Sequence, residues 1–225
     1  MLLNHRRALR LVAGLAVLTV AVFLLVGTDP NRGFVQDVDD WFLDLMVSAR
    51  VTPLVWVAKA LAFAGSVWLN WPIRIVVMVM LAVRRRWLQL SAFLLAVATS
   101  EPLIGILKEF YERPRPVGGL YATDSFSFPS GHAIAGAVTA VGIVIAVLPP
   151  GPKRWRWEVQ AAVFAGLMAL SRTYLGVHWL SDVVGGTLLG VTLAVGWPAL
   201  LQELRERRAA AGSRAAVADV SAEAG

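Results

Sequence analysis

The chain has 225 residues, of which 57% are hydrophobic, 16% are charged and none is cysteine. With a mean hydropathy of +0.65, the composition excludes an ordinary soluble domain and predicts an integral membrane protein, and the lack of cysteine excludes disulfides and thiolate metal sites. The net charge of +6 is concentrated in arginine-rich runs beside apolar segments, which membrane orientation explains better than nucleic-acid binding.

The apolar segments are long enough to predict membrane-spanning helices, since a helix needs about 20 apolar residues to cross a hydrocarbon core of about 30 Å. The predicted spans lie roughly at Leu9 to Gly27, Ser66 to Val83, Leu88 to Phe110, His132 to Leu148, Trp157 to Leu175 and Trp179 to Leu201. The first span follows basic residues, as a signal peptide does. Its apolar stretch is long, however, and no clear small-residue cleavage site follows, so we expect a retained helix.

Between the first two predicted spans, residues from Phe34 to Ala64 place apolar side chains at helical spacing among charged ones. This pattern is typical of amphipathic helices that lie at the bilayer surface. A seven-span alternative would use Val51 to Leu69, but it would leave the next span very short. We therefore predict an all-α, polytopic membrane bundle with about six transmembrane helices and interfacial amphipathic helices after the first.

Basic residues flank the membrane at every second predicted boundary, which the positive-inside rule assigns to the cytoplasm. These runs are Arg6-Arg7-Arg10, Arg84-Arg85-Arg86, Lys153-Arg154-Arg156 and Arg205-Arg207-Arg208. Both termini are then predicted to be cytoplasmic. The loop from Lys108 to Pro129, together with His132, Arg172 and His178, is predicted to meet at the extracytoplasmic side.

The last segment, residues 209–225, contains mainly Ala, Ser, Arg and Glu without aromatic residues. Such a composition buries little apolar surface, and it predicts a disordered cytoplasmic tail. Residues 1–208 are predicted to form a single membrane-embedded domain.

His178 and Asp182 are four residues apart at the start of the last predicted helix, and therefore lie on one helical face. In that position the carboxylate accepts the proton on Nδ1 of the imidazole and leaves Nε2 with a free lone pair for nucleophilic attack. The same spacing also fits an interfacial histidine near a chance aspartate.

His132 follows Ser130 and Gly131 where a loop enters a predicted helix. Glycine allows the backbone to approach an anion, and the amides at a helix start bind phosphate. A histidine at this point is suited to protonate a leaving alkoxide and then to deprotonate water. The alternative is an ordinary helix start with a serine N-cap.

Three cations, Lys108, Arg115 and Arg172, are predicted on the same side as both histidines. Phosphoryl transfer spreads negative charge over the equatorial oxygens, and fixed cations stabilise it. Taken singly, Lys108 also fits a helix-end lysine whose side chain reaches the interface, and Arg115 fits a solvated loop.

Together these residues resemble the three-part signature of the type 2 phosphatidic acid phosphatase family, which shares its site with vanadium-dependent haloperoxidases. The signature segments are Lys108 with Arg115-Pro116, then Pro129-Ser130-Gly131-His132, then Ser171-Arg172 with His178 and Asp182. Every fixed position is filled. The signature region with its supporting helices extends from about Leu88 to Leu201.

The resemblance implies a six-helix membrane phosphatase that needs no metal and no other cofactor. His178 would be the nucleophile, Asp182 its orienting partner, and His132 the acid that releases the lipid alcohol. The residues implied to bind the phosphoryl oxygens are Lys108, Arg115, Ser130, Gly131 and Arg172, and the supporting residues are Ser171 and Pro116.

We therefore expect hydrolysis of a lipid phosphate monoester or diphosphate through a phosphohistidine, at the extracytoplasmic surface of the plasma membrane. Phosphatidic acid, phosphatidylglycerophosphate and polyprenyl diphosphate all fit this class. The alternatives are a phosphotransferase, in which an alcohol acceptor replaces water, and a non-enzymatic lipid-binding protein. The expected partners are the lipid phosphate and the bilayer, with no nucleic acid and no obligatory protein partner.

Overall fold

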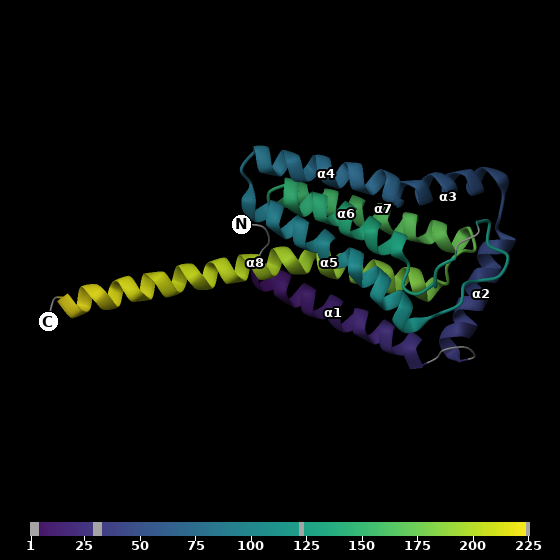
Figure 1. Ribbon diagram of the computed structural model, residues 1–225, viewed down its shortest axis with the longest axis horizontal. Coiled ribbons are helices and arrows are strands. Elements are labelled where there is room, and N and C mark those ends of the chain that lie inside the picture. The colour runs from purple at the N-terminus through teal and green to yellow at the C-terminus, as the bar shows by residue number, and fades with distance from the viewer. Residues whose placement is uncertain (1–4, 29–32, 122–123, 224–225) are drawn as a thin grey trace.

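The structure, a computed structural model, describes residues 5–28, 33–121 and 124–223 (Figure 1). All regular secondary structure within these ranges is helical. The helices are α1 (His5–Thr28), α2 (Phe34–Ser48), α3 (Thr52–Ala64), α4 (Val67–Val83), α5 (Trp87–Tyr111), α6 (Gly131–Val147), α7 (Pro152–Tyr174) and α8 (Leu180–Glu223). The predicted all-α class is therefore confirmed.

The helices α1, α4, α5, α6, α7 and the first part of α8 coincide with the predicted spans. By length and composition, α1, α5 and α8 could each cross a membrane, and α3 with α4 could form one further span bent by 45°. The apolar helix α6 has only 17 residues, and α7 begins with a charged segment. These helices agree with a polytopic membrane protein, whereas the number of six spans stays a prediction.

The helices α2 and α3 take different positions. Helix α2 lies across one end of the bundle, as an interfacial helix would, whereas α3 runs along the side of the bundle next to α4, from which it is bent by 45° (Figure 1). Apolar side chains of α3, among them Trp56 and Phe63, are exposed there. The expectation that this whole segment lies at the bilayer surface therefore fits α2 better than α3.

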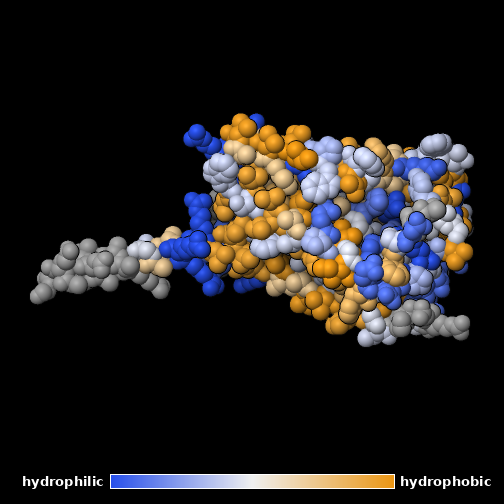
Figure 2. All heavy atoms as spheres, in the orientation of Figure 1, coloured by the Kyte–Doolittle hydropathy of each residue, from blue (hydrophilic) through white to orange (hydrophobic). Residues whose placement is uncertain are grey.

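The surface of the bundle has an apolar middle and two more polar ends (Figure 2). One polar end is where α4 is followed by α5 and where α8 leaves the bundle (Figure 1). This end carries the arginine run 84–86. The other end is covered by α2 and holds the starts of α6 and α8. The chain thus places its basic turns and its predicted site at opposite ends of an apolar belt.

Helix α6 is buried along most of its length, and it packs against α8 at two glycines. A Cβ atom at Gly186 would lie 2.7 Å from the carbonyl oxygen of Ser130, and one at Gly190 would lie 2.7 Å from that of Ile134. The glycines are one helical turn apart, so they form a single smooth face on α8. Their small size lets the two backbones touch beside the candidate site.

A buried arginine joins α4, α5 and α6 further along the bundle. Arg74 is 0% exposed and donates from Nη1 to Oε1 of Glu101 at 2.5 Å. It also donates from Nε to the hydroxyl of Thr139 at 2.8 Å and from Nη2 to the carbonyl of Ala135 at 3.2 Å. The guanidinium thus bonds to groups on both neighbouring helices, as a charge buried in an apolar bundle requires.

The C-terminal segment differs from its prediction. Helix α8 continues beyond the bundle as far as Glu223 (Figure 1), although the sequence predicts disorder for residues 209–225. Alanine, which is the most frequent residue of this segment, has the highest helix propensity, so a helix that leaves the bundle is readily continued. Residues 224–225 lie outside the described part of the chain.

Candidate active site

The predicted site residues come from four helix ends that meet under α2. Lys108 is in the last turn of α5, His132 in the first turn of α6, Arg172 in the last turn of α7, and His178 in the loop before α8. His132 lies near His178 and is close enough to Arg172, Arg115 and Lys108 for their positive charges to act on it. Residues separated by up to 70 positions in the sequence therefore form one cluster.

The two polar atoms of the His178 ring have different partners. Nδ1 lies 3.2 Å from Oδ2 of Asp182, one turn further along the chain. The same carboxylate oxygen accepts the backbone amide of Trp179 at 2.9 Å. Both side chains are buried, with 2% and 0% of their surface exposed. Because an ionised carboxylate only accepts, Nδ1 carries the proton and Nε2 presents its lone pair.

The free ring atom Nε2 faces a cation. Nη1 of Arg115 lies 3.1 Å from Nε2 of His178 and also donates to the carbonyl oxygen of Val177 at 2.6 Å. The other nitrogens of Arg115 donate to Ser125, from Nε to its carbonyl at 2.6 Å and from Nη2 to its hydroxyl at 3.0 Å. Burial lowers the pKa of Arg115, but an arginine remains charged at neutral pH.

Burial also controls the charge of His178. The pKa of this imidazole is lowered from 6.5 to about 4, because removal from water disfavours the charged ring more than the hydrogen bond to Asp182 favours it. The ring is therefore neutral at pH 7. Only a neutral imidazole has a free lone pair with which it can act as a nucleophile.

The segment from Ser130 to His132 starts helix α6. Ser130 is the N-cap, and its hydroxyl accepts the amide of Ala133 at 3.5 Å. Its own amide donates to the carbonyl of Asp182 at 3.1 Å, which ties the start of α6 to the first turn of α8. Gly131 follows, and a Cβ atom there would meet Ile104 at 3.1 Å. The arrangement brings the amides of a helix start next to the histidine pair.

Two further cations complete the cluster. Nζ of Lys108 donates to the carbonyl oxygen of Phe126 in the loop before α6. Arg172 is 5% exposed, and its Nε is a buried donor that bonds to no group among the described residues. A buried donor of this kind is suited to an anionic ligand, because an anion supplies both the hydrogen bond and the opposite charge.

The two predicted supporting residues lie beside these cations. The hydroxyl of Ser171 donates within its own helix, to the carbonyl of Met168 at 2.6 Å. Pro116 is buried and lines an open cavity of ≈ 380 Å³ with Arg115, Tyr121 and Gly176. Neither residue therefore presents a free polar hydrogen to the cluster.

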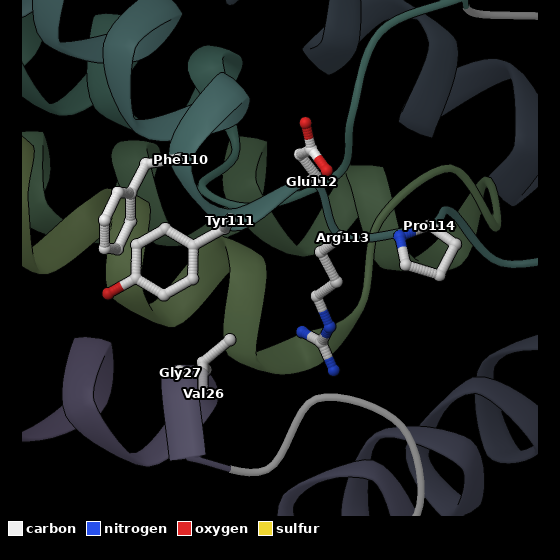
Figure 3. A pocket seen from close by; sticks show the side chains of 7 residues that line it. All are labelled: Val26, Gly27, Phe110, Tyr111, Glu112, Arg113 and Pro114. Carbon is white, nitrogen blue, oxygen red and sulfur yellow. The ribbon is translucent and has the colours of Figure 1, made fainter.

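Arg113 is a site residue that the sequence analysis did not predict. Its Nη1 donates to Oδ1 of Asp182 at 2.9 Å, and its side chain is 5% exposed. Figure 3 shows it beside a cavity of ≈ 290 Å³ at the ends of α1 and α5, where Tyr111 stands over Gly27. The loop sequence Arg-Pro-Arg-Pro suggests a solvated segment, and only the fold reveals that the first arginine is buried.

The imidazoles and carboxylates of this cluster are not arranged as metal ligands in the described part of the chain. Among residues 5–28, 33–121 and 124–223, no group of three or more His, Asp or Glu side chains is placed to hold a metal ion. The charges that face His178 and His132 are instead those of lysine and arginine. The site as described is suited to bind an anion.

Residues 89–206 match the PAP2 superfamily. The chain belongs to this superfamily. It is 31% identical over 177 residues to phosphatidylglycerophosphatase B of Bacillus subtilis. The aligned region covers 76% of this chain and 87% of the relative. A region of 65 residues is 42% identical to undecaprenyl-diphosphatase of Sulfolobus acidocaldarius and covers 29% of each protein. The family resemblance inferred from the signature is thus confirmed.

Solved structures support the same assignment for this PAP2 protein. The crystal structure of a transmembrane PAP2-type phosphatidylglycerolphosphate phosphatase from Bacillus subtilis matches with a TM-score of 0.74 and 29% identity, and covers 85% of this chain and 96% of that chain. The structure of Aquifex aeolicus LpxE matches with a TM-score of 0.59 at 23% identity, covering 71% of this chain and 93% of that one, and shows likeness of fold. The fold of this chain is therefore similar to that of a transmembrane PAP2-type phosphatase.

Proposed function

We propose that this PAP2 protein is a membrane phosphatase that hydrolyses a lipid phosphate monoester or diphosphate through a phosphohistidine on His178. The observation that carries the proposal is the pair of contacts made by the His178 ring. Its Nδ1 contacts the carboxylate of Asp182, and its Nε2 contacts the guanidinium of Arg115. A phosphoryl group that replaces the contact between Arg115 and Nε2 meets the nucleophile and a positive charge together.

The reaction has two transfers. Nε2 of His178 forms a bond to phosphorus while the bond from phosphorus to the lipid oxygen breaks, and His132 gives that oxygen a proton. His132 then takes a proton from water, whose oxygen attacks the phosphohistidine and releases inorganic phosphate. Asp182 stabilises the imidazolium character of His178 during both steps, and the positive charges of Lys108 and Arg172 offset the charge on the phosphoryl oxygens.

The proposed substrates have a phosphoryl group at a bilayer surface. The relatives carry the names phosphatidylglycerophosphatase B and undecaprenyl-diphosphatase, so phosphatidic acid, phosphatidylglycerophosphate and polyprenyl diphosphate are the classes to assay. The site lies at the end of the bundle opposite the basic turns (Figures 1 and 2). With the basic turns in the cytoplasm, it faces the extracytoplasmic side of the plasma membrane.

We also propose that turnover needs no divalent metal. The support for this is that Lys108, Arg115 and Arg172 provide the positive charge that a metal supplies in other phosphatases. Purified protein in EDTA should release phosphate at the rate seen without EDTA. Loss of activity in EDTA that magnesium restores would contradict the proposal.

The phosphohistidine is tested by trapping it. Purified protein is mixed with a lipid carrying ³²P-phosphate, quenched in alkali, which preserves phosphohistidine, and separated from lipid. Label on the protein is expected for the wild type, slower labelling for His132→Ala, since His132 protonates the leaving oxygen in the first transfer, and no label for His178→Ala. Arg84→Ala, an exposed arginine at the opposite end, serves as the control and should label as the wild type does. Label that persists in folded His178→Ala protein would contradict the mechanism.

The same assay separates hydrolysis from transfer. Release of inorganic phosphate without an added alcohol is the expected result, since the proposal uses water to resolve the intermediate. Release that depends strictly on an alcohol acceptor would make the protein a phosphotransferase.

A further inference from the structure

A carboxylate outside the signature lies behind the pair of His178 and Asp182. Asp39 belongs to α2, the helix across the end of the bundle, and only 1% of its surface is exposed. Its Oδ2 accepts a hydrogen bond from Nη2 of Arg113 at 2.7 Å. A charge this deeply buried is kept only where other groups compensate it, so its partners indicate its purpose.

Arg113 bridges two carboxylates. One terminal nitrogen, Nη2, binds Asp39, and the other, Nη1, binds Oδ1 of Asp182 at 2.9 Å. The second oxygen of Asp182, Oδ2, faces Nδ1 of His178. A continuous series of buried contacts therefore leads from α2 to the ring of the nucleophile. Each contact between opposite charges is strong, because the side chains are buried and both partners are charged.

Asp39 also completes the N-terminus of α8. Trp179, the residue before this helix, has no side-chain acceptor for the first helical amides. The amide of Trp179 itself is bound by Asp182, which is one half of a capping box. The other half comes from α2, since Oδ1 of Asp39 accepts the amide of Ser181 at 2.8 Å. Asp39 thus acts as the N-cap acceptor for the helix that carries Asp182.

The hydroxyl of Ser181 strengthens this attachment. It donates to Oδ2 of Asp39 at 2.5 Å and accepts from Nη1 of Arg113 at 2.6 Å. The amide of Gln36, one turn before Asp39, holds Nη2 of Arg113 through its Oε1 at 2.9 Å. Both terminal nitrogens of the guanidinium are therefore held from two directions, and Arg113 has little freedom to change its distance to Asp182.

We propose that Asp39 is a positioning residue for the phosphatase reaction. It caps α8 and fixes Arg113, so that Asp182 holds the His178 ring with Nε2 toward the phosphoryl group. Asp39 touches neither substrate nor His178. Its effect passes through Arg113 and Asp182, and the proposal rests on the proposed function of His178.

The effect of neutralising Asp39 follows from these contacts. Without its carboxylate, Arg113 has Asp182 as its remaining charged partner among the contacts described, and the attraction draws that carboxylate away from Nδ1 of His178. The ring then loses its fixed orientation, and a displacement of about 1 Å at a reacting group lowers a rate by up to about 100-fold. Substrate binding depends on other cations and is unaffected.

The test compares Asp39→Asn with Asp44→Asn, an exposed carboxylate on the same helix, in purified full-length protein. We expect kcat of Asp39→Asn to fall by about 10-fold to 100-fold with KM within about 2-fold of wild type, while Asp44→Asn matches wild type. A purely structural role for Asp39 would lower the melting temperature and the active fraction but leave kcat per folded molecule unchanged. Unchanged kcat, or a rise in KM alone, would overturn the proposal.

A second variant covers the case in which Asp39→Asn does not fold. Arg113→Lys keeps the charge but cannot bridge two carboxylates, and it should show the same loss of kcat with the same KM. Where both variants fold, their effects should not multiply in the double variant, since both interrupt one series of contacts. Full kcat in folded Arg113→Lys, or multiplying effects, would also overturn the proposal.

Failure of this inference is distinguishable from failure of the proposed function. His178→Ala is assayed beside the other variants. If His178→Ala turns over substrate as the wild type does, the proposed function fails. If His178→Ala is inactive while Asp39→Asn keeps full kcat, only the positioning role of Asp39 fails.

Discussion

Gly186 lies against Ser130 with no room for a side chain between them. A Cβ atom at Gly186 would stand 2.7 Å from the carbonyl oxygen and 3.3 Å from the amide nitrogen of Ser130. The first approach is closer than packed atoms tolerate and the second is tight, and both involve backbone, which cannot rotate away. The packing of α8 on α6 therefore decides where the N-cap of α6 lies.

From this contact we predict that Gly186→Ala lowers both stability and activity. Overpacking in a close interface costs about 1–3 kcal/mol, and the shift of Ser130 misplaces the start of α6 beside His132. Gly196→Ala on the same helix is the control, since the nearest atom to its added Cβ would be 3.8 Å away. Thermal unfolding and initial rates of phosphate release measure the two effects. Wild-type stability and rate in Gly186→Ala would contradict the contact.

Because His178 is buried, we predict that the free energy of unfolding falls in acid. Its pKa is about 4 in the folded protein, whereas in the unfolded chain an imidazole has its ordinary pKa of about 6.5. Between these values the unfolded state binds a proton that the folded state does not. The free energy of unfolding should therefore fall as pH falls from about 6.5 to about 4, and this contribution should not grow further below that range.

Two measurements check the pH prediction. In NMR spectra of ¹⁵N-histidine-labelled protein, the ring signals that are missing in His178→Asn should titrate with a midpoint near pH 4. The dependence of thermal unfolding on pH should be weaker in His178→Asn than in the wild type over the same range. A ring that titrates near its ordinary pKa would mean that His178 is not buried as described.

The ion pair between buried Arg74 and partly exposed Glu101 predicts a coupled effect on stability. Removal of Glu101 leaves the fully buried guanidinium of Arg74 without its counter-ion. Because Glu101 is partly exposed, we expect the free energy of unfolding to fall by about 2 kcal/mol, which is less than for a fully buried pair. Glu101→Gln should therefore destabilise the protein, and Arg74→Met/Glu101→Leu should destabilise it less than Glu101→Gln does. A double-mutant cycle by thermal unfolding measures the coupling, and additive effects would argue against the pair.

We predict that the protein tolerates removal of the part of α8 that extends beyond the bundle. Residues 209–213 are exposed, and this part of the helix projects away from the site (Figure 1). Deletion of residues 209–225 should leave kcat, KM and the melting temperature unchanged, in agreement with a catalytic domain confined to residues 1–208. A fall in kcat on deletion would show that the domain extends further.

The sequence by itself predicts a large part of this protein. Continuous apolar runs predict the helices α1 and α4 to α8, because a helix in lipid must satisfy its own backbone. Local spacing predicts that His178 pairs with Asp182, since residues four apart share a helical face. The contact is present in the structure, although His178 lies in the loop just before α8. Alternating basic turns predict that the histidines and Lys108 share one end of the bundle.

Only the tertiary structure decides which groups stand behind that pair. In the sequence, Asp39 is an acidic residue one turn from Val35 and Phe42 on an amphipathic helix. The residues near it in the sequence do not indicate that it contacts Arg113 or Ser181. Burial of Arg113, its bridge between Asp39 and Asp182, and the cap that α2 provides for α8 all depend on how distant helices dock. Such long-range contacts are fixed by packing and desolvation between the surfaces of distant helices, and these produce no periodic pattern of residues in the sequence.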